Sequence, residues 1–274
     1  MLLFTMRTYR SSRCWARLQP TSKFVSPLQM PNQYGLNRDI PDDIKRAVRQ
    51  RCGFGCILCA GSVFEYEHFD PEFARARQHN TAGITLLCPT CHAKKTRNLL
   101  SAWRVREANE NPAAIGRRYA YSELEGTLLR PFIKLAGMTL RNCEMPLQVR
   151  GFPVLQVEDA EFVGGPYRLS ATFFNASGKP SLFIRRNEWQ VLADSWDVEL
   201  VGSSITVRTG PREIALRLNF QAGVGLVVER LVMLCDGYRI VGNADTLDVY
   251  SPQGGRHRFT QCISDGMRIG LSLG

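Results

Sequence analysis

The chain has 274 residues, 44% of them apolar, and a formal net charge of +10 at pH 7. This length is enough for two modest domains, each with a hydrophobic core of its own. No stretch approaches the roughly 18 to 20 consecutive apolar residues of a membrane span, and the start lacks the long apolar run of a secretory signal, so neither class is expected.

The positive charge is unevenly distributed. Residues 1–30 contain no acidic residue, residues 31–118 carry a basic excess, and residues 119–274 hold equal numbers of acidic and basic residues. A basic N-terminal part with a neutral C-terminal part is typical of a polyanion-binding unit joined to a unit with another task. A solvated basic face would explain the same charges.

The first 29 residues show no clear periodicity, which predicts a disordered basic extension. An Arg-rich start without acids also suits a transit peptide. Because no clean amphipathic helix is visible there, we favour an extension upstream of a natural start at Met30.

Short elements are expected in residues 30–118. The first candidate helix begins with acidic and ends with basic side chains and has one apolar face. The first candidate strand shows period-2 alternation. The predicted elements are a helix at 41–50, strands at 63–69 and 84–87, and helices at about 91–95 and 99–108.

Residues 119–150 are ambiguous, and we expect a linker with the domain boundary there. Short alternating runs separated by Gly, Pro and Asn then predict an all-β domain over residues 151–274. Three similar four-residue motifs recur at nearly even spacing, which suits β-solenoid or prism-like repeats; a sandwich fits nearly as well. The motifs are Glu161–Gly164, Glu199–Gly202 and Arg239–Gly242.

Four of the nine cysteines form two Cys-x-x-Cys pairs. Two such pairs predict a closed, tetrahedral zinc site, because each short turn lets both sulfurs face one ion. Cys52 is the one competing ligand, and the spacing favours a reducing cytoplasm over a disulfide-bonded secreted protein. The expected ligands are Cys56, Cys59, Cys88 and Cys91, which leave Glu67, His68 and His92 as candidates for a second, open metal position.

The ordered set of Cys-x-x-Cys, acid-His and Cys-x-x-Cys-His-x-x-Lys resembles the zinc-knuckle branch of the HNH endonuclease family over about residues 44–101. The resemblance implies an α+β chain: an N-terminal ββα-metal module stapled by structural zinc, here followed by the all-β domain. It further implies that His68 is the general base of phosphodiester hydrolysis, and that Glu67 and His92 hold a catalytic magnesium or manganese ion.

One position departs from the family pattern. The middle Asn commonly lies five residues before the third cysteine, where this chain has Gly83. In the family that Asn braces the loop and orients the histidine. His79 or Asn80 is a candidate to take over this task.

Basic residues near the motif are candidate phosphate contacts, which would position a duplex without reading its sequence. Any one of them is better explained as a solvated charge, whereas the group as a whole fits both interpretations. They are Lys94, Lys95 and Arg97 after His92, and Arg75 and Arg77 in the preceding loop.

The sequence thus predicts an HNH-type DNA endonuclease of a bacterial cytoplasm. The alternatives are a non-catalytic zinc module that binds nucleic acid or protein, and an RNase or structure-specific nuclease. The neutral β-rich domain is expected to take a protein or small-ligand partner, or to form a homo-oligomer, rather than to bind DNA.

Overall fold

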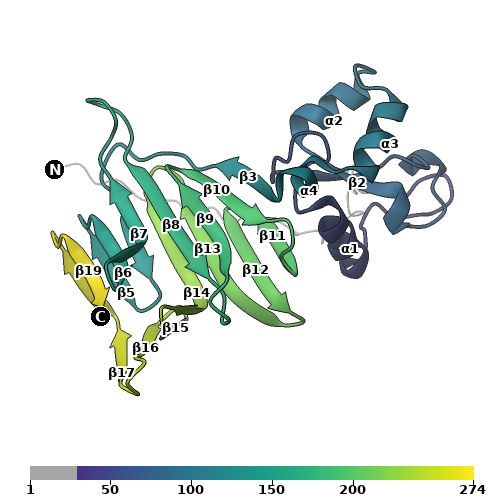
Figure 1. Cartoon of the computed structure of the whole chain (residues 1–274). Helices are drawn as coiled ribbons and strands as arrows, with labels where there is room; N and C mark the ends of the chain where they lie inside the picture. Colours follow the sequence, from purple (N-terminus) through teal and green to yellow (C-terminus); the bar gives the residue numbers. More distant parts are fainter. Residues whose placement is uncertain (1–29) are drawn as a thin grey trace, which may run out of the picture.

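The computed structural model describes residues 30–274 and has a mixed α+β fold (Figure 1). The expected basic extension lies outside the described residues. All α-helices of the described chain precede residue 118, and none is long and apolar enough to cross a membrane. The helices are α1 (Asp42–Cys52), α2 (Pro89–Thr96), α3 (Ala102–Glu110) and α4 (Ala113–Arg117), with 3-10 turns at Phe73–Arg75 and Thr81–Gly83.

The N-terminal region is built around an antiparallel hairpin followed by a helix. Strand β1 (Glu65–His68) pairs with β2 (Ile84–Leu87), so that Glu67 lies opposite Thr85, and α2 begins two residues after β2. The expected strands and helices of this region are confirmed, with ends shifted by a few residues. A small core of its own joins α1, β2 and α3 through Val48, Leu86 and Val105.

Helix α1 shows why these short elements form. Asp42 and Asp43 occupy its first turn and Arg49 and Arg51 its last, which suits the helix dipole. The helix ends at Gly53, whose φ of 69° is the left-handed geometry of a glycine C-cap. This turn directs the chain into the first cysteine pair.

The C-terminal region consists of two sheets. The seven-stranded sheet has the order β19 (Ile269–Leu273), β6 (Met145–Val149), β7 (Phe152–Glu158), β8 (Arg168–Phe174), β9 (Pro180–Arg185), β10 (Glu188–Leu192) and β3 (Tyr119–Glu123). The ten-stranded sheet runs through β11 (Asp197–Val201), β12 (Ser204–Gly210), β13 (Glu213–Gln221), β14 (Gly225–Cys235), β15 (Tyr238–Gly242), β16 (Thr246–Tyr250) and β17 (Arg256–Thr260), with β4 (Phe132–Leu135), β5 (Met138–Arg141) and β18 (Cys262–Asp265) beside this path.

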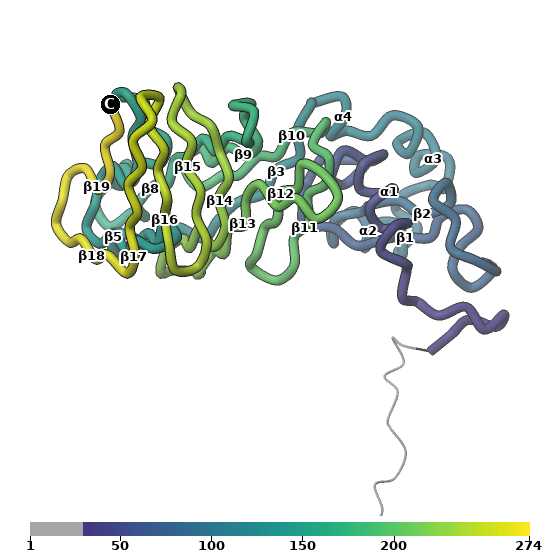
Figure 2. The backbone as a smooth tube through the Cα atoms, turned by 90° about the horizontal axis from the view of Figure 1, so that it is seen from below, coloured from purple at the N-terminus to yellow at the C-terminus, as the bar shows by residue number. Residues whose placement is uncertain are grey.

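The two sheets share one hydrophobic core, to which β8 contributes Phe173 and β14 contributes Leu231. Seen from below, the β14 to β17 layer lies across the β8 to β10 layer (Figure 2). The arrangement is therefore a sandwich, the second of the two architectures that the sequence left open.

The three similar four-residue motifs are not structural repeats. Glu161–Gly164 lies in an exposed loop between β7 and β8, Glu199–Gly202 ends β11 in a turn, and Arg239–Gly242 lies within β15. Their glycines serve different purposes: Gly202 supplies a turn with positive φ, whereas Gly242 lets Ala136 pack closely against the backbone. The solenoid or prism prediction was wrong because a recurring four-residue motif was interpreted as a sign of a repeated structural unit.

Residues 119–150, expected to be a linker, contain the four strands β3 to β6. These strands have only four or five residues each, too few for a clear period-2 signal. Strand β3 also connects the two regions, because Tyr121 bonds through its backbone to Ala60 and Ser62.

A buried ion pair and shared packing fix the two regions together. Arg49 of α1 donates two hydrogen bonds of 2.9 Å to the Asp197 carboxylate of β11, and both side chains are buried. Phe54 and Ala114, from the N-terminal region, belong to the core of the sandwich. The sandwich is thus packed directly against the cysteine-bearing region.

Candidate functional site

Four sulfurs converge beside the β1–β2 hairpin. The Sγ atoms of Cys56, Cys59, Cys88 and Cys91 all lie within 4.8 Å of one another, and those of Cys59 and Cys88 are 3.6 Å apart. Tetrahedral zinc with Zn–S bonds of about 2.3 Å separates its sulfurs by roughly 3.8 Å. The cluster can therefore hold a metal such as zinc.

Local backbone geometry builds this cluster. The Cys56 N–H donates to the Gly61 carbonyl, which folds the first pair into a tight turn. Cys88 caps α2, because its Sγ accepts a hydrogen bond from the Cys91 N–H. Cys52, the competing ligand, is fully buried against Thr85 and lies outside the cluster.

The chemistry of the cluster calls for a cation. Burial, together with the neighbouring sulfur of Cys56, raises the pKa of the Cys59 thiol to about 11. Burial raises the pKa of Cys91 as well. Four adjacent thiolates repel one another, so a bound cation is what makes the ionised ligand set stable.

Glu67 and His92 meet on the open side of the hairpin. The Nε2 of His92, on α2, lies 2.9 Å from a carboxylate oxygen of Glu67, and its Nδ1 lies 3.0 Å from Glu65. The other Glu67 oxygen accepts a hydrogen bond of 2.6 Å from Lys95. The two expected cation ligands are therefore brought together, and a second carboxylate lies beside the other nitrogen of the imidazole.

His68 lies on the other face of β1, because successive side chains of a strand alternate. It is buried, and its Nε2 lies 3.0 Å from Nδ1 of His79. Burial and then the nearby His79 lower the His68 pKa, which the Glu67 charge opposes. The imidazole is accordingly neutral at neutral pH, the form that can accept a proton.

Gly83 is fixed by the fold. A Cβ at this position would collide with the carbonyl oxygen of Asp70, while the Gly83 carbonyl accepts hydrogen bonds from the N–H groups of Phe69 and Asp70. No asparagine fits there. Of the two candidate substitutes, Asn80 caps the turn Thr81–Gly83, and His79 is the side chain that contacts His68.

The basic residues fall into two groups. Lys95 is paired with Glu67 and also lies 3.4 Å from Glu72, so its charge is already matched. The guanidinium of Arg77 lies over the Tyr34 ring. Four of the predicted side chains are exposed and form no ion pair within the described chain: Lys94, Arg97, Arg75 and Arg77.

Sequence reasoning missed the contributions of Glu65 and Glu72. The Glu65 carboxylate is exposed, yet it lies 3.0 Å from Nδ1 of His92. Its position two residues before Glu67 on an alternating strand was the available signal, since both then share one face. Nothing in the sequence placed Glu72 against Lys95, because the intervening turn follows no periodic pattern.

Comparisons with protein-family models, with curated proteins and with solved structures gave no match.

Proposed function

We propose that the chain is a metal-dependent HNH-type endonuclease that hydrolyses DNA phosphodiester bonds. One observation carries the proposal: Glu67 and His92 meet within 2.9 Å on an antiparallel hairpin and helix that lie beside the four-cysteine cluster. A carboxylate and an imidazole in contact suit a manganese or magnesium ion whose other positions stay open to water and phosphate oxygens.

In this proposal each residue of the site has a different task in the hydrolysis. A divalent cation held by Glu67 and His92 supplies positive charge that stabilises the phosphate as its leaving oxygen departs. Glu65 holds the imidazole of His92 in place through Nδ1, as a supporting carboxylate commonly does for a ligand histidine. His68, neutral, buried and on the opposite face of β1 from Glu67, is the proposed general base, and it can accept the proton only of a water that reaches it around the end of the strand.

Cleavage of supercoiled plasmid with magnesium or manganese tests this proposal. Wild type should convert the plasmid to nicked or linear form, and His68→Ala should lose at least a hundredfold in rate, since a general base contributes about 10²–10⁴-fold. His257→Ala, which alters an exposed histidine of β17, is the matched control and should cut normally. Zinc content must be equal in all three proteins.

Two results would contradict the proposal. One is wild type that cuts neither duplex DNA, single strands nor RNA with either ion. The other is His68→Ala that cuts as fast as wild type. Preferential cleavage of RNA or of a branched substrate would keep the site and change the substrate.

A second candidate function is a non-catalytic zinc module that binds nucleic acid or protein. The 2.6 Å contact of Lys95 with Glu67 favours it, because a matched ion pair neutralises the proposed cation ligand. Lys95→Met separates the two functions: it should tighten manganese binding if Glu67 is a ligand, and leave it unchanged if the pair is purely structural.

A further inference from the structure

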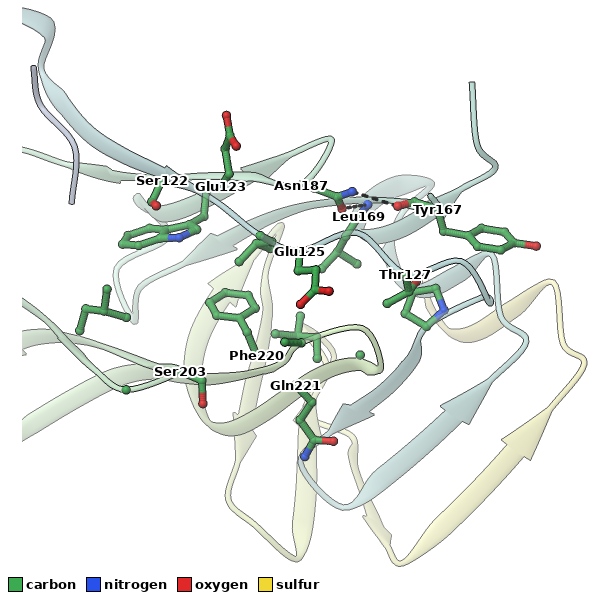
Figure 3. A pocket seen from close by; sticks show the side chains of 18 of the residues that line it. Ser122, Glu123, Glu125, Thr127, Tyr167, Leu169, Asn187, Ser203, Phe220 and Gln221 are labelled. Carbon is green, nitrogen blue, oxygen red and sulfur yellow. Dashed lines mark hydrogen bonds between the residues drawn. The ribbon is translucent and has the colours of Figure 1, made fainter. Parts of the chain in front are cut away.

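A cavity of about 240 Å³ lies between the two sheets of the sandwich, at the end that faces the N-terminal region (Figure 3). Strands β3, β8 and β10 line it from one sheet, and β11, β13 and β14 from the other. Its volume is below the roughly 300–1,000 Å³ of sites for drug-sized molecules. An occupant of one or two rings would fit.

The walls are mainly apolar and include three aromatic side chains, Tyr167, Trp189 and Phe220, together with Leu200. Aromatic walls favour a planar ring, which can stack or meet them edge to face. They also attract a cationic group placed over a ring face.

One buried side-chain oxygen of the lining lacks a partner. The side-chain oxygen of Thr127 is buried without a hydrogen bond in the described chain, and the residue is only 7% exposed. Asn187, by contrast, is satisfied, because its amide bonds the backbone of Leu169 and Tyr167. An orphaned buried hydroxyl costs about 1–3 kcal/mol, which a ligand with a hydrogen-bonding group would recover.

The charge of the lining has one sign. It contains Glu123 and Glu125 and no Lys, Arg or His. Figure 3 shows the Glu125 carboxylate directed toward the centre of the labelled side chains, whereas that of Glu123 points outward. Neither carboxylate forms an ion pair within residues 30–274. Arg130, which lies over the Tyr167 ring, is already paired with Asp159.

We propose that this cavity binds a small planar aromatic molecule that carries a cationic or hydrogen-bond-donating end. The ring lies among Trp189, Phe220 and Leu200, and the donor end reaches Glu125 and the Thr127 hydroxyl. The two carboxylates disfavour an anionic ligand. The inference does not depend on nuclease activity.

The cavity is also close to the cysteine cluster along the chain. Val63 and Ser122 belong to its lining. The neighbours of these two residues are joined, because the Ser62 N–H donates to the Tyr121 carbonyl over 2.8 Å. A ligand in the cavity therefore contacts the segment that links the first cysteine pair to β1.

Binding of benzamidine and of benzoate to the full-length protein tests the proposal, since the two molecules match in size and differ in charge. Titration followed by tryptophan fluorescence and calorimetry should show benzamidine binding at least about tenfold more tightly than benzoate. Leu200→Trp should abolish binding by filling the cavity. Val201→Trp, at the exposed neighbouring position, is the matched control and should bind normally.

Thr127→Val is a second variant in case Leu200→Trp fails to fold. It should weaken benzamidine binding severalfold while the free protein unfolds at the same or a higher temperature, because an unpartnered hydroxyl has been removed. Equal binding of both probes, binding that survives Leu200→Trp, or no binding of benzamidine would each overturn the proposal.

Discussion

The two regions of this molecule are stabilised in different ways. The N-terminal region has a small core, a two-stranded hairpin and short helices, with four cysteines converging at its centre. The sandwich has a continuous core between two sheets. A small core gains less free energy from packing than a large one, whereas a structural metal contributes folding free energy directly. The comparison predicts that the first region depends on a metal bound by its cysteines and the second on its side-chain packing.

Removing one sulfur should have the largest effect. Cys88→Ser removes a ligand sulfur of the cluster, while the serine hydroxyl can still cap α2. Since structural zinc contributes apparent binding free energies of about 10–16 kcal/mol, the N-terminal region should lose its ion and unfold. Metal content by mass spectrometry and limited proteolysis would show cleavage confined to residues 30–118.

The control is Cys262→Ser, which alters a cysteine outside the cluster and should leave the metal content unchanged. Full protease resistance of Cys88→Ser would show that packing, not metal, holds the first region together.

The opposite change tests the sandwich. Phe173→Ala removes a fully buried ring from β8, and such truncations cost about 3–5 kcal/mol. Thermal unfolding should fall by several degrees while the zinc content stays at one ion per chain. Phe162→Ala is the matched control, because that phenylalanine is exposed in the loop before β8. A loss of zinc in Phe173→Ala would show that the two regions unfold as one unit.

The junction between the regions should have an intermediate effect. Arg49→Ala leaves Asp197 buried with only the 3.4 Å contact of Arg208, so we expect a loss of about 2–4 kcal/mol. Two separate unfolding transitions should appear in calorimetry. Arg104→Ala, which breaks an exposed pair with Glu107, should cost less than about 0.5 kcal/mol. If Arg49→Ala still unfolds in a single transition, shared packing around Phe54 dominates the junction.

The sequence predicted the first region better than the second, for a physical reason. Metal ligands and helix ends are marked by residue type, so the cysteine pairs and α1 could be located within a few residues. Which strands pair in a sandwich depends on contacts between distant residues. No local signal in the sequence predicts that β3 pairs with β10, which lies far along the chain. The same holds for the pairing of β4 with β14 in the second sheet.

In the candidate site as well, contacts within the sequence motif were predicted and contacts between distant residues were not. Glu67 and His92 were predicted as neighbours, and they are. The buried pair of Arg49 and Asp197 was not predicted, because the two residues lie far apart in the sequence and neither belongs to a motif. The sequence showed that Gly83 occupies the position of the family's asparagine. The physical reason, the close approach of the Asp70 carbonyl, is visible only in the folded chain.

The smallest effect on stability, and the sharpest test of how the first region uses polar contacts, should come from His79. This side chain is only half-buried and contacts Nε2 of His68. His79→Ala should leave zinc content and melting temperature unchanged, because no core packing is lost. Under the proposed nuclease function, it should nevertheless lower the kcat of plasmid cleavage about tenfold, as the His68 ring becomes free to turn. His79→Asn, which keeps a hydrogen-bonding group at this position, should recover part of the rate. An unchanged kcat in His79→Ala would mean that burial alone orients His68. It would also mean that His79 does not replace the asparagine that the HNH family has at the position of Gly83.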